Sequence, residues 1–396
     1  MERWKTVGLI EKLDKGIGCL LVLLAVSSCI SEPMSRNAVR LAILLGVVRL
    51  CLGPEILYPM KKYTGIAAAM AAMAAMLGIS AWYSGSFMRE ITGSTFWYNY
   101  NMLLFFLAAA CIRTRTQLRN VLWGLLLSLL AVDLYIYWQA MHGVVRPNTF
   151  MRGNFMLTAM FYVILLPGLF TLLLQKKIKH RRSYALYTLL SLAAIFINST
   201  RGAWLALLLT AVFLLLYYRK LKQLLVLLCT AGILLGGICM VSPVWQARIH
   251  SVTDMQDQSH KERLLMWQSA LHMAMDHPLL GVGLGNYTAE YQQNYISPQA
   301  KEPDLKHAHS NFFQFLAEDG LFGLAVYCGS AGYILYWFGK RRKNFFAMMA
   351  FSSSLALLIY STNDYTFAGY AGMRVYWLLL GLCARGIEIT ETDSGG

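Results

Sequence analysis

The sequence predicts an all-α polytopic membrane protein with about twelve transmembrane helices and one large loop on the outer face. Two observations predict this class. First, 57% of the 396 residues are hydrophobic and only 14% are charged, with a mean hydropathy of +0.48, whereas a soluble chain of this length carries far more charge. Second, the apolar residues gather into stretches that approach the roughly 20 residues needed to cross a membrane as a helix.

Twelve apolar stretches are candidate spans, of which the first two are short. They lie near residues 16–30, 38–53, 64–82, 97–112, 120–138, 155–175, 184–198, 203–218, 223–242, 321–338, 344–361 and 370–384. We expect a single membrane domain over residues 1–396. Its one sizeable soluble part is the loop 243–310 between spans nine and ten, a length that usually signals function or local helices.

The orientation of the chain follows from the lysines and arginines of its short connections. Positive charge gathers in alternate connections, at 60–62, 113–119, 175–182, 219–222 and 339–343. Because short cytoplasmic loops carry the excess of Lys and Arg, these segments and both termini are expected in the cytoplasm. The remaining connections then face outward, near 31–37, 83–96, 139–154, 199–202, 243–310 and 362–369.

The net charge of +15 does not indicate a nucleic-acid partner, since the basic runs are short and sit where cytoplasmic anchors belong. We therefore expect membrane lipids and no nucleic acid as partners. The eight cysteines lie in or beside apolar runs, so neither a disulfide framework nor a zinc spacing is predicted.

Histidines are concentrated in the large outer loop, which holds six of the eight. His307 and His309 differ from the others because they stand where this loop re-enters the membrane. An H-x-H pair without a neighbouring carboxylate or cysteine set is weak evidence for a metal site. We expect neither a metal nor a cofactor.

Several arginines lie on the predicted outer face, against the usual distribution of positive charge. Arg201 occupies a very tight turn, Arg248 and Arg263 lie in the large loop, and Arg146 and Arg152 precede the sixth span. Each alone could simply reach the lipid headgroups. Together they indicate an anionic ligand, because the planar guanidinium binds phosphate oxygens in pairs and stays charged.

A spacing around the second histidine carries a resemblance to a known family. His309-Ser310 is followed by nine residues, Gly320, two residues and Gly323. "STRGAW" (199–204) looks like the family's short outer turn with its functional arginine. "RLLMWQSALHMAMDHPLLGVGLGNY" (263–287) looks like its large-loop segment, with an arginine ahead of a Trp-bearing helix. "RGNFM" (152–156) is a looser match. By these motifs the sequence resembles the O-antigen ligase and O-antigen polymerase superfamily of bacterial envelope glycosyltransferases.

The glycines of the large-loop segment do not have the spacing of a dinucleotide site. Gly281, Gly283 and Gly285 predict a loop whose backbone turns tightly or approaches another element closely. Gly320 and Gly323 are expected to allow close packing where the histidine-bearing helix enters the membrane.

The resemblance implies a GT-C-like fold in the bacterial inner membrane, with the active site in the periplasm. The implied reaction transfers a glycan from undecaprenyl diphosphate to lipid A core or another glycan acceptor. His309 would act as the base, and Arg201 and Arg263 would bind the donor diphosphate. Possible supporting residues are His307, Ser310, Arg152, Asn154, Arg248 and Asp364.

The local chemistry agrees with these roles. A sugar hydroxyl is a poor nucleophile, and a positioned base accelerates its attack by about 10²–10⁴-fold. A histidine, whose pKa is ordinarily about 6.5, suits that role near neutral pH. The lipid diphosphate leaves as a stable anion, so arginines can neutralise it without a metal. The expected reaction is inverting and metal-independent.

The motifs leave the acceptor open. A ligase joins finished O-antigen to lipid A core, a polymerase joins repeat units, and a related oligosaccharyltransferase glycosylates protein; we favour the ligase. A lipid-glycan transporter is the alternative from another class. A transporter predicts polar residues deep in several spans and no outer histidine base, and the outward clustering of Arg and His argues against it.

Overall fold

The computed structural model describes residues 2–53, 60–92, 100–151, 155–175, 178–226, 229, 258–301 and 303–394. Every regular element in these ranges is a helix, which confirms the all-α fold class. The elements are α1 (Glu2–Ser27), α2 (Glu32–Leu52), α3 (Thr64–Tyr83), α4 (Phe87–Thr92), η2 (Tyr100–Met102), α6 (Leu103–Cys111), α7 (Arg115–Met141), α8 (Phe155–Leu173), α9 (Arg181–Asn198), α10 (Arg201–Tyr217), α13 (Gln258–Asp276), α14 (Tyr287–Glu290), η3 (Tyr291–Tyr295), α15 (Asn311–Gly339), α16 (Phe345–Tyr360), η4 (Thr366–Ala368) and α17 (Tyr370–Ser394).

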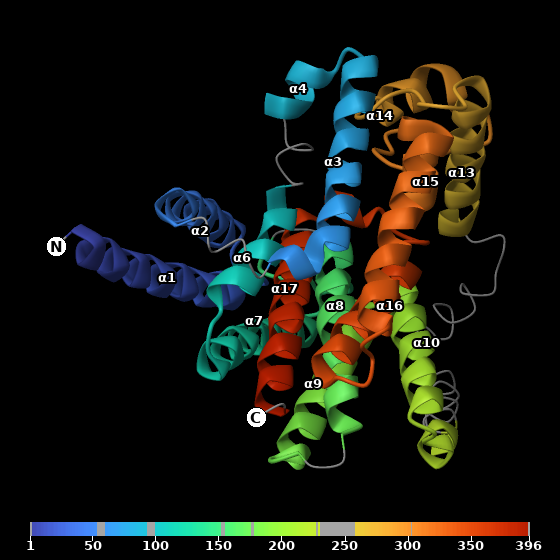
Figure 1. Cartoon of the computed structure of the whole chain (residues 1–396). Helices are drawn as coiled ribbons and strands as arrows, with labels where there is room; N and C mark the ends of the chain where they lie inside the picture. The colour runs from blue at the N-terminus through green and yellow to red at the C-terminus, as the bar shows by residue number, and fades with distance from the viewer. Residues whose placement is uncertain are drawn as a thin grey trace.

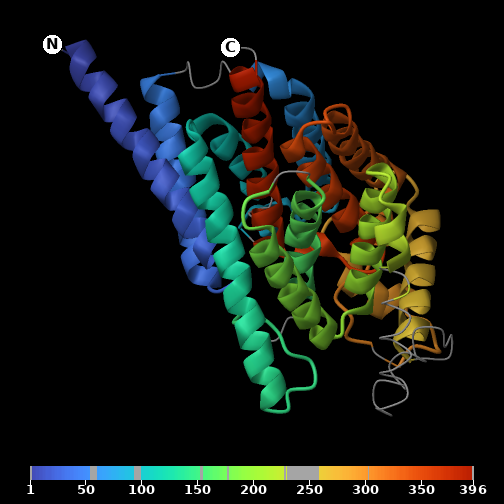
Figure 2. The ribbon, with the colours of Figure 1, turned by 90° about the horizontal axis from the view of Figure 1, so that it is seen from below.

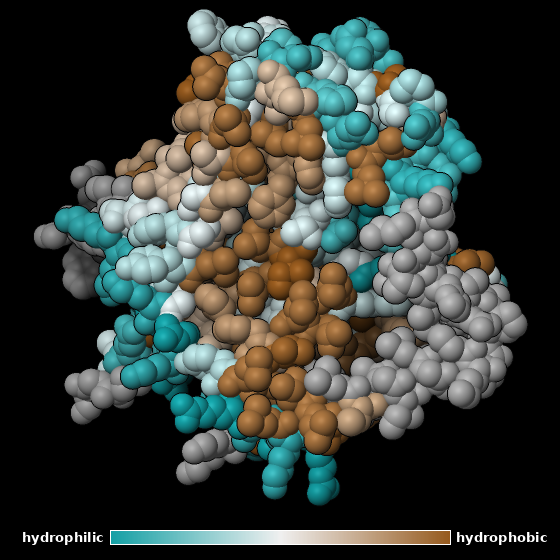
Figure 3. Space-filling view, turned by 90° about the vertical axis from the view of Figure 1, so that its right-hand side faces the viewer, coloured by the Kyte–Doolittle hydropathy of each residue, from teal (hydrophilic) through white to brown (hydrophobic). Residues whose placement is uncertain are grey.

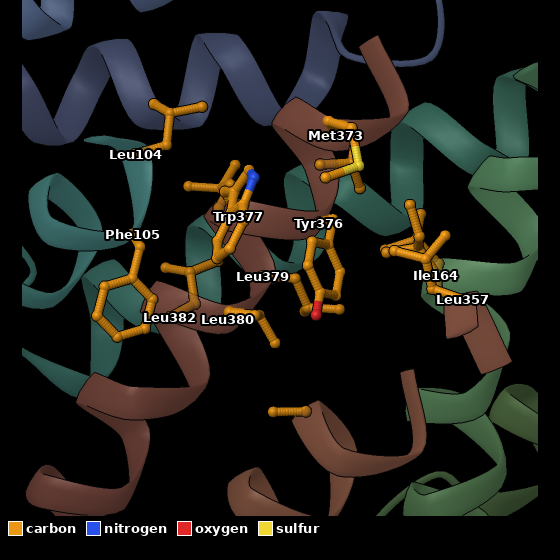
Figure 4. Close-up of a cluster of buried hydrophobic side chains, with 14 of the residues drawn as sticks. Leu104, Phe105, Ile164, Leu357, Met373, Tyr376, Trp377, Leu379, Leu380 and Leu382 are labelled. Carbon is orange, nitrogen blue, oxygen red and sulfur yellow. The ribbon is translucent and has the colours of Figure 1, made fainter. Parts of the chain in front are cut away.

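The core of the bundle is built around α8 and α17. Nearly every residue of α8 from Thr158 to Leu169 is buried, as expected for a helix that is apolar on all sides. Side chains of α17 meet those of α6, α8 and α16 in one apolar cluster (Figure 4). Close approach requires a glycine here, because a Cβ at Gly381 would lie 2.4 Å from the Phe105 carbonyl oxygen.

The remaining helices surround this core. α1 and α2 pair at one side of the molecule, and α1 also packs against α7 (Figures 1 and 2). α3 and α13 both pack against α15 (Figure 1). On the side that faces right in Figure 1, apolar side chains form a broad band down the middle, and hydrophilic side chains gather at the top, at the lower end and along the left edge (Figure 3). This distribution suits a protein whose middle is surrounded by lipid.

The number of spans is only partly supported. Among the described residues, four helices are long and apolar enough to cross a membrane, at Met60–Tyr83, Arg115–Met141, Phe155–Leu173 and Asn311–Gly339. Three apolar helices in the same ranges are shorter, at Tyr100–Cys111, Arg201–Tyr217 and Phe345–Tyr360. The predicted ninth span, 223–242, lies mostly outside the described residues. The total of twelve spans therefore stays a prediction.

Two of the basic connections lie near the last turns of α17. Lys62 Nζ lies 3.5 Å from Glu388 Oε1, and Arg385 Nε donates to the Ile112 carbonyl just before the basic segment 113–119. These contacts agree with the predicted grouping of 60–62 and 113–119 at one end of the bundle, and the full alternation of the connections stays a prediction. Which end faces the cytoplasm stays a prediction.

Candidate active site

One cavity of about 450 Å³ brings together the three residues with the firmest sequence prediction. Arg201, Arg263 and His309 all line it, although they lie on α10, α13 and the loop before α15. Four of the connections predicted to face outward meet here: 139–154, 199–202, 243–310 and 362–369. The full lining is Arg146, Phe155, Met156, Ser199, Thr200, Arg201, Gly202, Gln258, Glu262, Arg263, Met266, Leu305, His309, Tyr360 and Asn363.

The backbone around His309 is held on both sides. The indole of Trp267, on α13, donates a hydrogen bond of 2.9 Å to the Ala308 carbonyl and stacks on Phe313 of α15. His309 itself adopts a left-handed conformation, with φ of 49°. Its backbone N–H donates to Nδ1 of His307 over 3.2 Å, and the two rings meet edge to face with centroids 4.2 Å apart. His307 thus helps to fix the conformation of its neighbour.

Asp364 lies beside the His309 imidazole, where the sequence predicted a supporting residue. The distance from His309 Nδ1 to Asp364 Oδ1 is 3.9 Å, which is too long for a hydrogen bond. Nδ1 is buried and has no hydrogen-bond partner within the part of the chain that the structure describes. Catalytic hydrogen bonds are often long before substrate binds and shorten in the complex. Asn311 anchors the loop that carries Asp364. Its backbone N–H donates to the Ser361 carbonyl, and its side-chain Oδ1 accepts from the backbone N–H of Thr366.

Arg201 is the first residue of α10, directly after a sharp turn. Ser199 is left-handed in this turn, with φ of 64°. Asn198 ties the turn to the segment before α8 by donating to the carbonyls of Pro147 (2.8 Å) and Phe155 (3.3 Å). The N-terminus of a helix favours an anion, so the location of Arg201 reinforces the charge of its side chain.

Arg146 is a lining residue to which sequence reasoning gave no specific role. Its guanidinium lies over the ring of Phe155, 3.5 Å from the centroid. The available signal was its position on the predicted outer face. Three other predicted residues, Arg152, Asn154 and Arg248, lie outside the described residues.

Ser310 immediately precedes α15 and is 1% exposed. Its carbonyl accepts from the Gln314 N–H, whereas its buried Oγ has no partner among the described residues. The structure therefore places Ser310 beside His309 but shows no helix-capping role for its hydroxyl.

Gly320, the first glycine of the histidine motif, breaks α15 and is more than a position of close packing. Gly320 has φ of 64° and ψ of −161°, which interrupts the helix. The freed backbone groups pair with the glycine loop, because the Leu321 N–H donates to Pro278 and the Val282 N–H donates to Ala317. A Cβ at Gly281 would lie 2.4 Å from the Ala317 carbonyl oxygen, which confirms the predicted close approach.

Glu318 completes this junction. Its Oε1 accepts the N–H groups of Gly285 (3.0 Å) and Tyr287 (3.2 Å) at the start of α14. Backbone hydrogen bonds and the Glu318 carboxylate together join the two large-loop helices to the first part of α15.

We predict that His307 makes stability depend on pH. Burial, with smaller contributions from His309 and Arg263, lowers the pKa of His307 to about 4, although Asp364 opposes the shift. In the unfolded chain this imidazole binds its proton near pH 6.5, so the unfolded state holds more protons between the two values. Neutral His307 makes its full contribution to the free energy of unfolding above pH 6.5, and this contribution is lost as the pH falls toward 4.

Thermal unfolding of the purified protein between pH 7 and pH 4 checks this prediction. His307→Asn should flatten the decline, because Asn lacks the ionisation and can still accept the His309 N–H. The matched change at the exposed His272 should leave the wild-type slope. Equal slopes for the wild type and His307→Asn would contradict the prediction.

Within the described residues, no group of three or more His, Cys, Asp and Glu side chains is arranged to hold a metal ion. The cavity instead combines three arginines with one histidine and the Glu262 carboxylate, and Asp364 lies beside the histidine. This set can bind a diphosphate and accept a proton close to it.

The fold and the cavity define a helical membrane protein in which three arginines and a histidine line one cavity. Residues 186–328 match the family model described as O-Antigen ligase. The match contains Arg201, Arg263 and His309, and it confirms the resemblance to the O-antigen ligase and polymerase superfamily. A search of curated proteins finds no match to this chain.

Proposed function

We propose that the chain is an O-antigen ligase-type glycosyltransferase of the bacterial inner membrane. It would move a glycan from undecaprenyl diphosphate to lipid A core at the periplasmic face. The observation that carries the proposal is the cavity shared by Arg201, Arg263 and His309, which come from three separate segments of the chain. Their convergence is expected if a phosphate-bearing donor and a proton acceptor must meet at one point.

In the proposed reaction, His309 takes the proton of an acceptor hydroxyl. The oxygen then attacks the anomeric carbon of the donor sugar, a new C–O bond forms with inversion, and the bond to the diphosphate breaks. Undecaprenyl diphosphate leaves with the electron pair of that bond. Arg201 and Arg263, with Arg146 beside them, stabilise the charge on this leaving group, and Asp364 stabilises the imidazolium.

The arginines give a direct test of donor binding. Arg201→Ala and Arg263→Ala should each raise the KM for the lipid-linked donor by about 10–100-fold, the range expected for a lost hydrogen bond to a charged group. Arg→Lys should restore only part of the affinity, because an ammonium cannot pair two phosphate oxygens with a planar fork. The measurement is donor titration with membranes that contain the protein.

Arg182→Ala is the control, since this exposed arginine is the second residue of α9 and does not line the cavity. An unchanged donor KM in both cavity variants would contradict the assignment of Arg201 and Arg263.

The glycan that accumulates in cells identifies the acceptor. In cells that express only the Arg201→Ala, Arg263→Ala double variant, long chains left on undecaprenyl diphosphate indicate a ligase. Single repeat units indicate a polymerase, and normal surface polysaccharide with unmodified protein indicates an oligosaccharyltransferase. Normal surface polysaccharide and normal protein glycosylation would contradict glycan transfer altogether.

A further inference from the structure

A buried carboxylate faces the same cavity as the arginines and has no part in the proposed reaction. Glu262 belongs to the first turns of α13, is 3% exposed and lines the cavity together with Gln258. Its Oε1 accepts the Lys301 N–H over 2.9 Å and also accepts from the Gln258 side chain. Its Oε2 is buried without a hydrogen-bond partner among the described residues.

A buried carboxylate oxygen without a donor is costly, so this one needs a partner that enters with the substrate. A carboxylate only accepts hydrogen bonds, and it repels a diphosphate. The hydroxyl groups of a sugar are neutral donors and meet both conditions. Gln258 adds an amide, which can donate to and accept from hydroxyls.

The position of Glu262 relative to Arg263 relates this carboxylate to the diphosphate. Consecutive residues have Cα atoms 3.8 Å apart, and on a helix their side chains point about 100° away from each other. Arg263 can therefore contact the diphosphate while Glu262 contacts the group next to it. In a lipid-linked glycan that neighbouring group is the first sugar.

We propose that Glu262 and Gln258 form a saccharide subsite that binds hydroxyl groups of the sugar attached to the diphosphate. The inference rests on the proposed function, because it takes the arginines to hold a diphosphate. The cavity then has a cationic part for the leaving group and an acidic part for the sugar.

The test measures binding of two probes to the purified full-length chain in lipid nanodiscs. One probe is undecaprenyl diphosphate, and the other is undecaprenyl diphosphate carrying N-acetylglucosamine. Glu262→Gln keeps the shape of the side chain but removes its charge. We expect the affinity for the sugar-bearing probe to fall about tenfold, as for a lost charged hydrogen bond. The affinity for the bare diphosphate should stay constant or rise, because a repelling charge is gone.

Glu290→Gln is the matched control, since Glu290 lies on α14, pairs with Asn294 and does not line the cavity. It should change neither affinity. If Glu262→Gln fails to fold, Gln258→Ala provides the second test, with the same selective loss of the sugar-bearing probe expected.

The two proposals fail in different ways. Equal effects of Glu262→Gln on both probes, or no effect on the sugar-bearing one, would overturn the saccharide subsite while leaving the diphosphate site intact. Wild-type protein that binds neither probe would overturn the proposed function and the subsite with it.

Discussion

Replacing His309 with alanine is expected to reduce kcat for glycan transfer by about 10²–10⁴-fold, the usual contribution of a positioned base. The donor should still bind with nearly wild-type affinity, because Arg201 and Arg263 remain in the cavity. This pattern is opposite to that of the arginine variants, which should affect mainly the donor KM. Transfer is measured with labelled lipid-linked donor in membranes, and the amount of protein is checked in parallel.

His277→Ala is the control for the histidine experiment. His277 is exposed at the end of α13 and does not line the cavity, so transfer should continue at the wild-type rate. Full activity of His309→Ala would rule out this residue as the base and would leave the arginines as a binding site alone.

Gly320→Ala is expected to destabilise the fold by at least about 3 kcal/mol. The combination of φ 64° and ψ −161° is open to glycine almost alone and costs other residues about 1–3 kcal/mol. In addition, the new Cβ would lie 2.5 Å from the backbone of Leu279, which cannot yield as a flexible side chain could. Unfolding of the purified protein in detergent measures the effect.

Gly329→Ala is a matched change in the same helix. Its Cβ would meet no atom within 4 Å. Replacing a glycine inside a helix by alanine stabilises the helix by about 1 kcal/mol or less. Its stability should therefore equal or slightly exceed that of the wild type. If Gly320→Ala were as stable as Gly329→Ala, the break in α15 could not be a structural requirement.

Hydropathy predicted the helical fold well because a span must satisfy its own backbone hydrogen bonds, and a helix does so from local sequence. It does not decide which face of a helix is buried, and the count of spans stays a prediction. On α13, apolar side chains stand on two faces: Leu264, Leu271 and Met275 are exposed, whereas Met266 and Met273 on the opposite face are buried. Periodicity cannot choose between two apolar faces of one helix, since that choice is made by the partner helix.

The site was predictable to the extent that its residues stood in recognisable motifs. His309, Arg201 and Arg263 were named in this way, but their convergence on one cavity depends on tertiary packing that no local pattern encodes. Glu262 was missed for a physical reason. A glutamate near the start of an amphipathic helix usually faces water, and only the surrounding structure shows that this one is buried.

Because of the backbone hydrogen bonds at Gly320, the geometry of the cavity does not depend on the identity of the side chains that line it. Backbone hydrogen bonds, together with the Glu318 carboxylate and the stack of Trp267 on Phe313, join the large-loop helices to α15, and none of these three side chains lines the cavity. The lining residues could therefore change while the distance between Arg263 and His309 stayed constant. In the proposed reaction, the same scaffold would then accommodate different sugars without a new arrangement of the arginines and the histidine.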